Sequence, residues 1–284
     1  MSKTILITGA STGFGHLSAV RLAEQGHRVF ASMRSPTTKN SSHAKALESY
    51  GVNVIELDVT CNQSIQAAVE LVLQKSGRLD VLVNNAGIAA AGVSEAFSDD
   101  QLKELFDINV FGVQRMMRSA LPAMRKQKSG LIINVGSILG RVTFPFFGLY
   151  GASKFALEAL TESYRYELSQ LGVECVLIQP SAFPTSMYSS AKQPNDMNRV
   201  AQYGEIGSIP EAMFAQFMAA FESSGAPDPI DVAVGIRELV AMPQGTRPDR
   251  VTIGADYGSK SINEFTATVQ RGVVEQLGLE LLCK

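Results

Sequence analysis

The sequence lacks several features that mark particular classes of protein. It has no tryptophan and only three cysteines, Cys61, Cys175 and Cys283, which lie far apart. Such cysteines argue against a disulfide framework or a zinc site, and they favour reduced thiols and a cytoplasmic location. The three histidines have no partners at metal-ligand spacing, so we expect no metal. The N-terminus shows no charged region followed by an apolar run and a cleavage site, so we expect no secretory signal.

Charge and hydropathy argue against two further classes. The formal net charge of the 284 residues is -2, without the basic excess typical of nucleic-acid binding. No apolar run approaches the about 20 residues that span a bilayer. The hydrophobic content of 45% is that of an ordinary globular protein. We therefore expect a globular protein that acts on a small molecule, with no nucleic acid and no membrane span.

Glycines are concentrated near the N-terminus, where they favour a phosphate site. The apolar run 4–8 is typical of a buried parallel strand, and apolar residues at helical spacing follow the glycines. Glycine lets the backbone approach a pyrophosphate, and a helix N-terminus offers free N–H groups. The spacing is Gly-x-x-x-Gly-x-Gly, not the Gly-x-Gly-x-x-Gly of most dinucleotide enzymes. The residues expected to bind the cofactor here are Gly9, Ser11, Thr12, Gly13, Phe14 and Gly15.

The end of the second predicted strand, 28–33, indicates which cofactor binds. NAD enzymes usually place an acid here for the ribose 2′-hydroxyl. This chain has Arg34 instead, with no acid between Val29 and Lys39. A guanidinium binds a 2′-phosphate by charge-assisted hydrogen bonds, so we expect NADP(H). The alternative is that Arg34 is a solvated loop residue.

Strand and helix patterns alternate along the rest of the chain. Strands are predicted at 52–57, 79–83, 131–135, 173–179 and 250–254, with helical segments between them. This order indicates right-handed crossovers and a parallel sheet, whose ligands bind at the carboxyl ends of the strands. A capping box at 60–63 is expected to open one helix. Further cofactor residues are expected at the strand ends: Asp58, Val59, Asn85, Ala86 and Gly87.

Tyr150 and Lys154 stand four residues apart, on one face of a predicted helix. A nearby cation lowers the pKa of a phenol from about 10. The pair is therefore a candidate general acid/base, although a helix-surface pair has the same spacing. Ser137 follows a predicted strand and supplies a second hydroxyl. Asn109 is a poor mid-helix residue and is expected to break the hydrogen-bond ladder of a helix over about 100–125.

In order and spacing these motifs resemble those of the short-chain dehydrogenase/reductase family, from Lys3 to about Gly258. The residues that carry the resemblance are Thr8-Gly9-x-x-x-Gly13-x-Gly15, Asn84-Asn85-Ala86-Gly87, Asn109, Ser137 and Tyr150-x-x-x-Lys154. The resemblance implies one α/β domain over 1–284: a Rossmann-type, doubly wound, seven-stranded parallel sheet with helices on both faces. It implies a catalytic set of Asn109, Ser137, Tyr150 and Lys154. It also implies a homodimer or homotetramer, packed through the helices that carry Asn109 and Tyr150.

The resemblance extends to the cofactor and substrate sites. Tyr150 and Lys154 are expected to contact the cofactor, as are Pro180, Phe183 and Thr185. Ser181 departs from the usual glycine after the proline, which leaves the local backbone path open. We expect a substrate lid at about 185–225, irregular and then helical, and a helical tail at about 259–284. Plain core packing is the alternative for the apolar stripe of the lid. The expected pocket residues are Phe144, Phe147, Phe183, Met187, Phe214, Phe217 and Met218.

Together these features predict an NADP(H)-dependent oxidoreductase that interconverts a ketone or aldehyde with an alcohol. Tyr150 would be the general acid/base, supported by Lys154. The aromatic residues suggest a bulky apolar substrate such as a steroid, retinoid or aryl ketone, and the sequence most resembles NADP-linked steroid and retinol dehydrogenases. Two alternatives are a non-catalytic NADP-binding module that senses redox state and an epimerase of the same superfamily.

Overall fold

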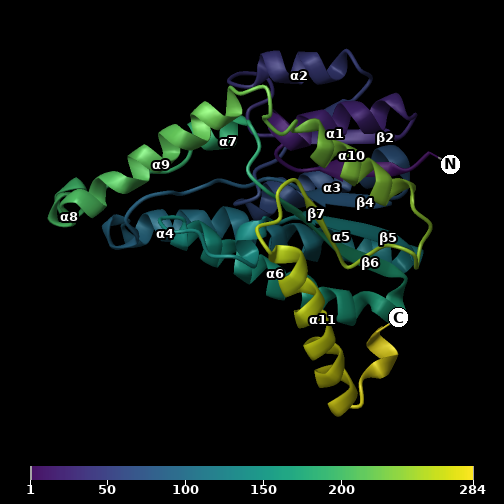
Figure 1. The fold of residues 1–284 in the computed structure, drawn as a ribbon. Helices are drawn as coiled ribbons and strands as arrows, with labels where there is room; N and C mark the ends of the chain where they lie inside the picture. Colours follow the sequence, from purple (N-terminus) through teal and green to yellow (C-terminus); the bar gives the residue numbers. More distant parts are fainter. Residues whose placement is uncertain (1, 284) are drawn as a thin grey trace.

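A parallel β-sheet forms the centre of the computed structural model, which describes residues 2–283 (Figure 1). The seven strands are β1 (Thr4–Ile7), β2 (Arg28–Met33), β3 (Asn53–Glu56), β4 (Val81–Asn84), β5 (Gly130–Val135), β6 (Val173–Pro180) and β7 (Arg250–Ile253). Their order in the sheet is β3-β2-β1-β4-β5-β6-β7. The reversal of direction between β1 and β4 makes the sheet doubly wound and creates a crevice at their carboxyl ends. The predicted fold class is confirmed.

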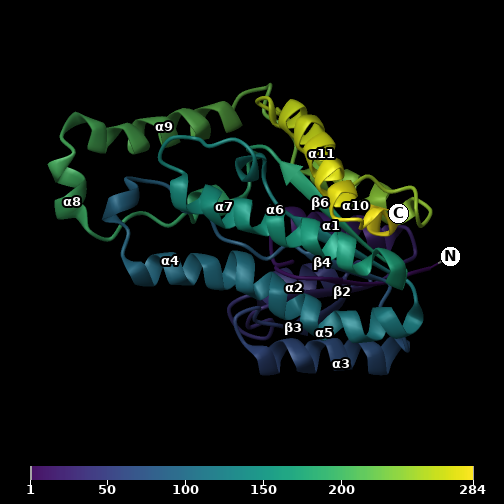
Figure 2. The same cartoon turned by 90° about the horizontal axis from the view of Figure 1, so that it is seen from below.

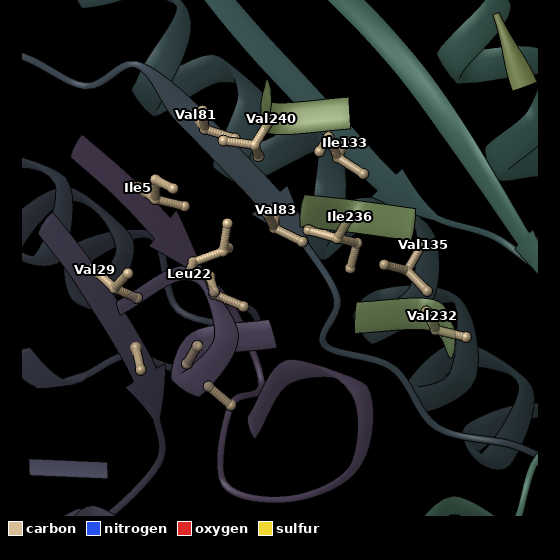
Figure 3. Packing of buried hydrophobic residues seen from close by; sticks show 14 of the residues in the cluster. Ile5, Leu22, Val29, Val81, Val83, Ile133, Val135, Val232, Ile236 and Val240 are labelled. Atoms are coloured by element: carbon tan, nitrogen blue, oxygen red, sulfur yellow. The ribbon is translucent and has the colours of Figure 1, made fainter. Parts of the chain in front are cut away.

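Helices cover both faces because alternate residues of each strand point to opposite sides. On β1, Ile5 and Ile7 pack with helices α1 (Gly13–Glu24), α2 (Ser41–Glu48) and α10 (Ile230–Ala241). Figure 3 shows this core, with Leu22 of α1 and Ile236 of α10 directed at the sheet. Leu6 points the other way, toward helices α3, α5 and α6. Those helices span Asn62–Ser76, Gly112–Gln127 and Gly148–Leu168, and α3 lies beside α5 (Figure 2).

Of two predictions about helices, the break at Asn109 and the start at 60–63, only the first is correct. The break at Asn109 is confirmed: α4 (Asp99–Phe106) and α5 are joined by a π-helical turn at Asp107–Phe111. The capping box at 60–63 is wrong, because α3 begins after Cys61 and has no side-chain cap. The Thr60 hydroxyl donates instead to Asp58 Oδ1 at 2.7 Å, since a carboxylate is the stronger acceptor.

The segment expected to be irregular after Thr185 is mostly helical. It forms α7 (Ser186–Ser189), α8 (Met197–Gln202) and α9 (Glu205–Phe221), and α8 and α9 extend away from the sheet (Figure 1). No residue of α9 is buried. The C-terminal helix α11 (Ser259–Gln276) lies where a helical tail was expected and projects from another side of the molecule. Within residues 2–283, no helix combines the length and apolar character needed to cross a membrane.

Candidate active site

The turn after β1 is tightly packed against the end of β4. Gly9 has φ +66°, and a Cβ there would lie 2.7 Å from Ala86 Cα. A Cβ at Gly15 would lie 2.5 Å from Asn85 Nδ2. Gly13 also has a positive φ, +57°, where α1 begins. The glycines at these positions therefore permit both the close approach and the backbone conformation.

Thr8 and Asn85 hold this arrangement together. The Thr8 hydroxyl accepts the backbone N–H groups of Asn85 and Ala86, each at 3.0 Å. In return, Asn85 Nδ2 donates to the carbonyls of Thr8 and Gly9, both at 2.9 Å. The Asn85 side chain, predicted as a cofactor contact, thus first serves to bind the two loops to each other.

The N-terminus of α1 has the features of an anion site. Thr12 is its N-cap residue, but no side chain accepts a hydrogen bond from the first-turn N–H groups. The Thr12 hydroxyl is instead 2.8 Å from the Ser186 hydroxyl of α7. The free N–H groups and the positive end of the helix dipole fit a phosphate.

A cleft of about 550 Å³ runs along the carboxyl ends of the central strands. It brings together most of the predicted cofactor residues: Gly9, Ser11, Thr12, Gly13, Phe14, Arg34, Asp58, Val59, Asn85, Ala86, Gly87 and Thr185. Residues missed by the sequence reasoning also line it, among them Lys39, Asn40 and Ile88. The predicted cofactor residues outside its lining are Gly15, Tyr150, Lys154, Pro180 and Phe183.

Three charged side chains line the cleft, and two of them are cationic. The charged residues in its lining are Arg34, Lys39 and Asp58. Burial alone would raise the pKa of Asp58. Hydrogen bonds from Thr60 and the positive charges of Arg34 and Arg115 lower this pKa by more than burial raises it, so the net shift is downward. Asp58 is therefore an ionised carboxylate already engaged by Thr60, and Arg34 and Lys39 are available to an anion.

Three of the predicted catalytic residues meet at the end of β5 and the start of α6. Ser137 is the second residue after β5, and Tyr150 and Lys154 lie one turn apart on α6. All three are buried, at 7%, 8% and 4% exposure respectively. The Ser137 hydroxyl accepts a hydrogen bond from the Leu139 N–H at 3.1 Å and lies close enough to the Tyr150 phenol to lower its pKa. Two hydroxyls thus converge on one point.

Burial controls the protonation of Tyr150 and Lys154. It raises the pKa of Tyr150 to about 12, against a smaller lowering by the Ser137 hydrogen bond. It lowers the pKa of Lys154 to about 8. The expectation that the neighbouring cation would lower the Tyr150 pKa is therefore wrong, because desolvation dominates. At neutral pH Tyr150 is a neutral phenol that can donate its proton.

Lys154 is held close to the phenol it would support. Its Nζ donates to the Val135 carbonyl at 3.0 Å and lies 5.6 Å from the centroid of the Tyr150 ring. At that distance an ammonium group is placed to stabilise a phenolate.

Asn109 joins the loop after β4 to α6. Its Oδ1 accepts the Ile88 N–H at 2.9 Å, and its Nδ2 donates to the Ile88 carbonyl at 2.9 Å and to Ser153 Oγ at 3.1 Å. Ser153 Oγ in turn donates to the Tyr150 carbonyl at 2.7 Å. A Cβ at Gly87 would lie 3.3 Å from Asn109 Oδ1 and 3.9 Å from Lys154 Nζ, so the predicted catalytic set shares one location.

An apolar cavity of about 30 Å³ lies against Tyr150. Four predicted pocket residues line it: Phe144, Phe147, Met187 and Phe217. Three others do not. Phe183 is 1% exposed and packs edge-on against Phe14 in the core, at 5.6 Å between ring centroids. Phe214 packs against Tyr188 on α7. Met218 does not line the cavity, because consecutive residues of a helix point in directions about 100° apart and Phe217 already points into it.

Six lining residues of this cavity were not predicted. They are Ala89, Ile138, Leu139, Ala182, Tyr188 and Tyr257. Position next to Ser137 was an available signal for Ile138 and Leu139. Tyr257 had none: it reaches the cavity from the loop before α11 with φ +46° and packs edge-on against Phe144 at 5.1 Å.

Comparison with known proteins places this geometry in a family. The family model described as short chain dehydrogenase matches residues 3–196. The chain is 40% identical over 184 residues to a 3-ketodihydrosphingosine reductase of Bacteroides thetaiotaomicron, covering 64% of this chain and 65% of that protein. It is 40% identical over 187 residues to human 17-beta-hydroxysteroid dehydrogenase type 1, covering 63% of this chain and 56% of that protein. The chain thus matches less than two thirds of the length of each of these relatives.

Structural similarity extends over nearly the whole chain. The crystal structure of a short-chain dehydrogenase from Streptomyces avermitilis has a TM-score of 0.79 at 28% identity, and the match covers 98% of this chain and 97% of that one. The glycine turn, the buried hydroxyl pair and Lys154 lie at the carboxyl edge of a sheet shared with that enzyme. The chain belongs to the short-chain dehydrogenase/reductase family of oxidoreductases.

Proposed function

We propose that this protein is an NADP(H)-dependent oxidoreductase that interconverts a ketone or aldehyde with an alcohol on a bulky apolar substrate. The observation that carries the proposal is the meeting of the Ser137 hydroxyl and the Tyr150 phenol beside an apolar cavity. That cavity adjoins the cleft, because Met187 lines both. A substrate oxygen between the two hydroxyls would therefore lie next to the cofactor site.

The protein's part in the reaction is orientation and proton transfer. Bound NADP(H) supplies the hydride chemistry. In the reducing direction, Ser137 and Tyr150 hold the substrate oxygen, and Tyr150 donates its proton to the developing alkoxide. The high pKa of the phenol keeps that proton available at neutral pH. The Lys154 ammonium stabilises the phenolate left behind, and Asn109 holds a water that connects Lys154 to solvent.

The cleft supports NADP(H) as the cofactor. The free N–H groups at the start of α1 would hold the pyrophosphate, and Thr185 would contact the nicotinamide amide. Arg34 and Lys39 would hold the 2′-phosphate, which a cation binds and a carboxylate repels. Tyr150 and Lys154, although outside the cleft lining, would face the nicotinamide ribose.

The apolar cavity supports a hydrophobic substrate and a mobile lid. Its about 30 Å³ is far below the roughly 300–1,000 Å³ of pockets that hold drug-sized ligands. A bulky substrate therefore requires displacement of the segment 185–225, whose Phe217 forms one wall. With no buried residue, α9 can move at small cost in packing. Two relatives named for a ketosphingolipid and a hydroxysteroid support a substrate of this kind.

Assembly and location are part of the proposal. We expect a homodimer or homotetramer that packs through α5 and α6, and a monomer by light scattering would contradict it. Three free cysteines fit the reducing cytoplasm.

A screen of NADPH consumption tests the function. The panel contains steroid ketones, retinal, aryl ketones and quinones, with sugar aldehydes and short 2-keto acids as polar controls. We expect turnover on apolar carbonyls only. Turnover confined to the polar controls would refute the substrate class. Tight NADPH binding without turnover on any carbonyl would favour the non-catalytic binding module.

A further inference from the structure

The turn that carries Ser137 is clamped onto α6. It continues as the short 3-10 helix η3 (Ile138–Gly140). A Cβ at Gly140 would lie 2.9 Å from Glu158 Cγ and 3.0 Å from the Lys154 carbonyl oxygen. The turn could not approach α6 this closely with a larger residue. The position of Ser137 relative to α6 therefore depends on this contact.

Arg141 ends the turn and binds two other elements. Its Nη2 lies 3.0 Å from Glu158 Oε2 on α6, and its Nε donates to Asn263 Oδ1 on α11 at 3.0 Å. The side chains of Arg141 and Glu158 are 13% and 4% exposed. In a pair shielded from water to this degree, loss of one partner removes an attraction that solvent does not replace. Arg141 thus connects the Ser137 turn to α6 and α11 through contacts that are largely shielded from solvent.

The ion pair belongs to a larger cluster, buried at Glu158 and exposed at Asp249, whose charges balance. Glu158 also accepts from Arg250 Nε at 3.0 Å, and Arg250 pairs with Glu162. Glu162 accepts from Arg165 at 2.6 Å, and Arg165 lies 3.1 Å from Asp249. With the arginine on the turn, three guanidinium groups face three carboxylates. This balance keeps Glu158 available as a fixed anionic anchor.

Asn263 connects the same anchor to the C-terminal helix. Its Nδ2 donates to Gln179 Oε1 at 2.7 Å, and Gln179 Nε2 donates to Glu158. Gln179 lies fully buried in β6, beside the strand that leads into Ser137. Helix α11 is therefore bonded directly to the Ser137 turn through Arg141, and it is connected through Gln179 to Glu158 on the helix that carries Tyr150.

We propose that Arg141, held by Glu158 and Asn263, is a positioning residue that fixes the Ser137 turn against the helix carrying Tyr150 and Lys154. Glu158 follows Lys154 by one helical turn, so the link ends on the face of α6 that carries the proposed ammonium group. The inference rests on the proposed function, since it takes Ser137 to act on the substrate oxygen. Arg141 itself lines neither the cleft nor the apolar cavity.

A double-mutant cycle in NADPH-dependent reduction of an aryl ketone tests this role. Arg141→Met, which keeps much of the side-chain volume, should lower kcat by about tenfold through misplacement of the Ser137 hydroxyl. The Kd for NADPH should stay within about twofold, because the cleft is untouched. In a Ser137→Ala background the same substitution should lower the residual kcat by less than about twofold, since the group it positions is gone. Equal losses in both backgrounds, or no loss in the first, would overturn the proposal.

Two further measurements separate positioning from general stability. Arg165→Met removes an arginine at the other end of the same cluster. Its effect on kcat should be small, and it should be the same in the wild-type and Ser137→Ala backgrounds. Amide hydrogen exchange, read without any substrate, should speed up over residues 136–142 in Arg141→Met and stay unchanged there in Arg165→Met. Unchanged exchange at 136–142 in a folded Arg141→Met would refute the role even for an enzyme that reduced no ketone. Failure of wild-type turnover alone would instead count against the proposed function. If Arg141→Met does not fold, the double-mutant cycle and the exchange measurement are made with Arg141→Lys, which keeps the charge but lacks the forked guanidinium group that contacts both Glu158 and Asn263.

Discussion

Replacing Arg34 with alanine tests the proposed role of this side chain at the 2′-phosphate of NADP. The Arg34 side chain is exposed at the end of β2 and lines the cleft with Lys39. A hydrogen bond to a charged group contributes roughly 1.5–3 kcal/mol, and exposure to solvent places this one near the lower end. A loss of about 1.5 kcal/mol corresponds to a roughly tenfold increase in the Kd for NADPH. NADH lacks the 2′-phosphate, so its Kd should change by less than about twofold.

The assay is titration of each cofactor by the fluorescence of its nicotinamide at low and high ionic strength. The NADPH effect of Arg34→Ala should shrink at high salt, because an exposed ion pair is screened. Arg271→Ala, an exposed arginine on α11 outside the cleft, is the matched control and should leave both Kd values unchanged. Equal weakening of NADPH and NADH, or no weakening of either, would refute the assignment of Arg34 to the 2′-phosphate.

Three further predictions test the cradle, the buried lysine and the lid. Gly9→Ala should lower the free energy of unfolding by about 2 kcal/mol and weaken NADPH binding. The control Gly51→Ala is also at positive φ but has open space for a Cβ, so it should lower the free energy of unfolding by less and leave NADPH binding unchanged. Equal effects of the two substitutions would contradict the close approach of Gly9 to Ala86. Because burial lowers the Lys154 pKa from 10.5 to about 8, the unfolded chain binds more protons at this residue between those values, so the contribution of Lys154 to the free energy of unfolding should rise with pH from about 8 to 10. In urea titrations the stability of the wild type should therefore rise relative to that of Lys154→Met over this range, and a difference that does not change with pH would count against a buried Lys154. Phe217→Ala should lower kcat/KM for a bulky apolar ketone by about tenfold without changing the Kd for NADPH. Met218→Ala, at a residue outside the cavity lining, should change neither quantity. Equal effects of the two substitutions on kcat/KM would show that Phe217 does not contact the substrate.

The parts of the site that follow directly from a strand end were predictable. Residues such as Arg34 and Asp58 end parallel strands, and all such ends meet at one edge, so adjacency in the cleft follows from the alternating pattern alone. The same holds for the break at Asn109, because asparagine competes with a helix for its own backbone hydrogen bonds. The strand pattern and local hydrogen bonding therefore suffice to predict where these residues lie.

The errors arose where tertiary contacts decide. Phe183 is apolar and follows β6, which suited a pocket, yet its partner is Phe14, which is distant in sequence. Thr60 is a local exception: its position suited a helix cap, but its hydroxyl donates to the Asp58 carboxylate two residues before it. The pKa of Tyr150 depends on how completely the folded chain excludes water from the phenol, and neighbours in sequence do not encode that quantity. Ser181 needed no glycine, because its φ lies outside the left-handed region.

The central claim is that the Tyr150 phenol donates the proton to the substrate oxygen. The most direct test is Tyr150→Phe, which removes one hydroxyl from a residue that is 8% exposed and leaves the ring packing in place. Single-turnover oxidation of bound NADPH by an aryl ketone should slow by about 10²-fold or more, the usual contribution of a general acid, while the NADPH Kd and the thermal midpoint stay close to wild type. Wild-type turnover by Tyr150→Phe would contradict the account.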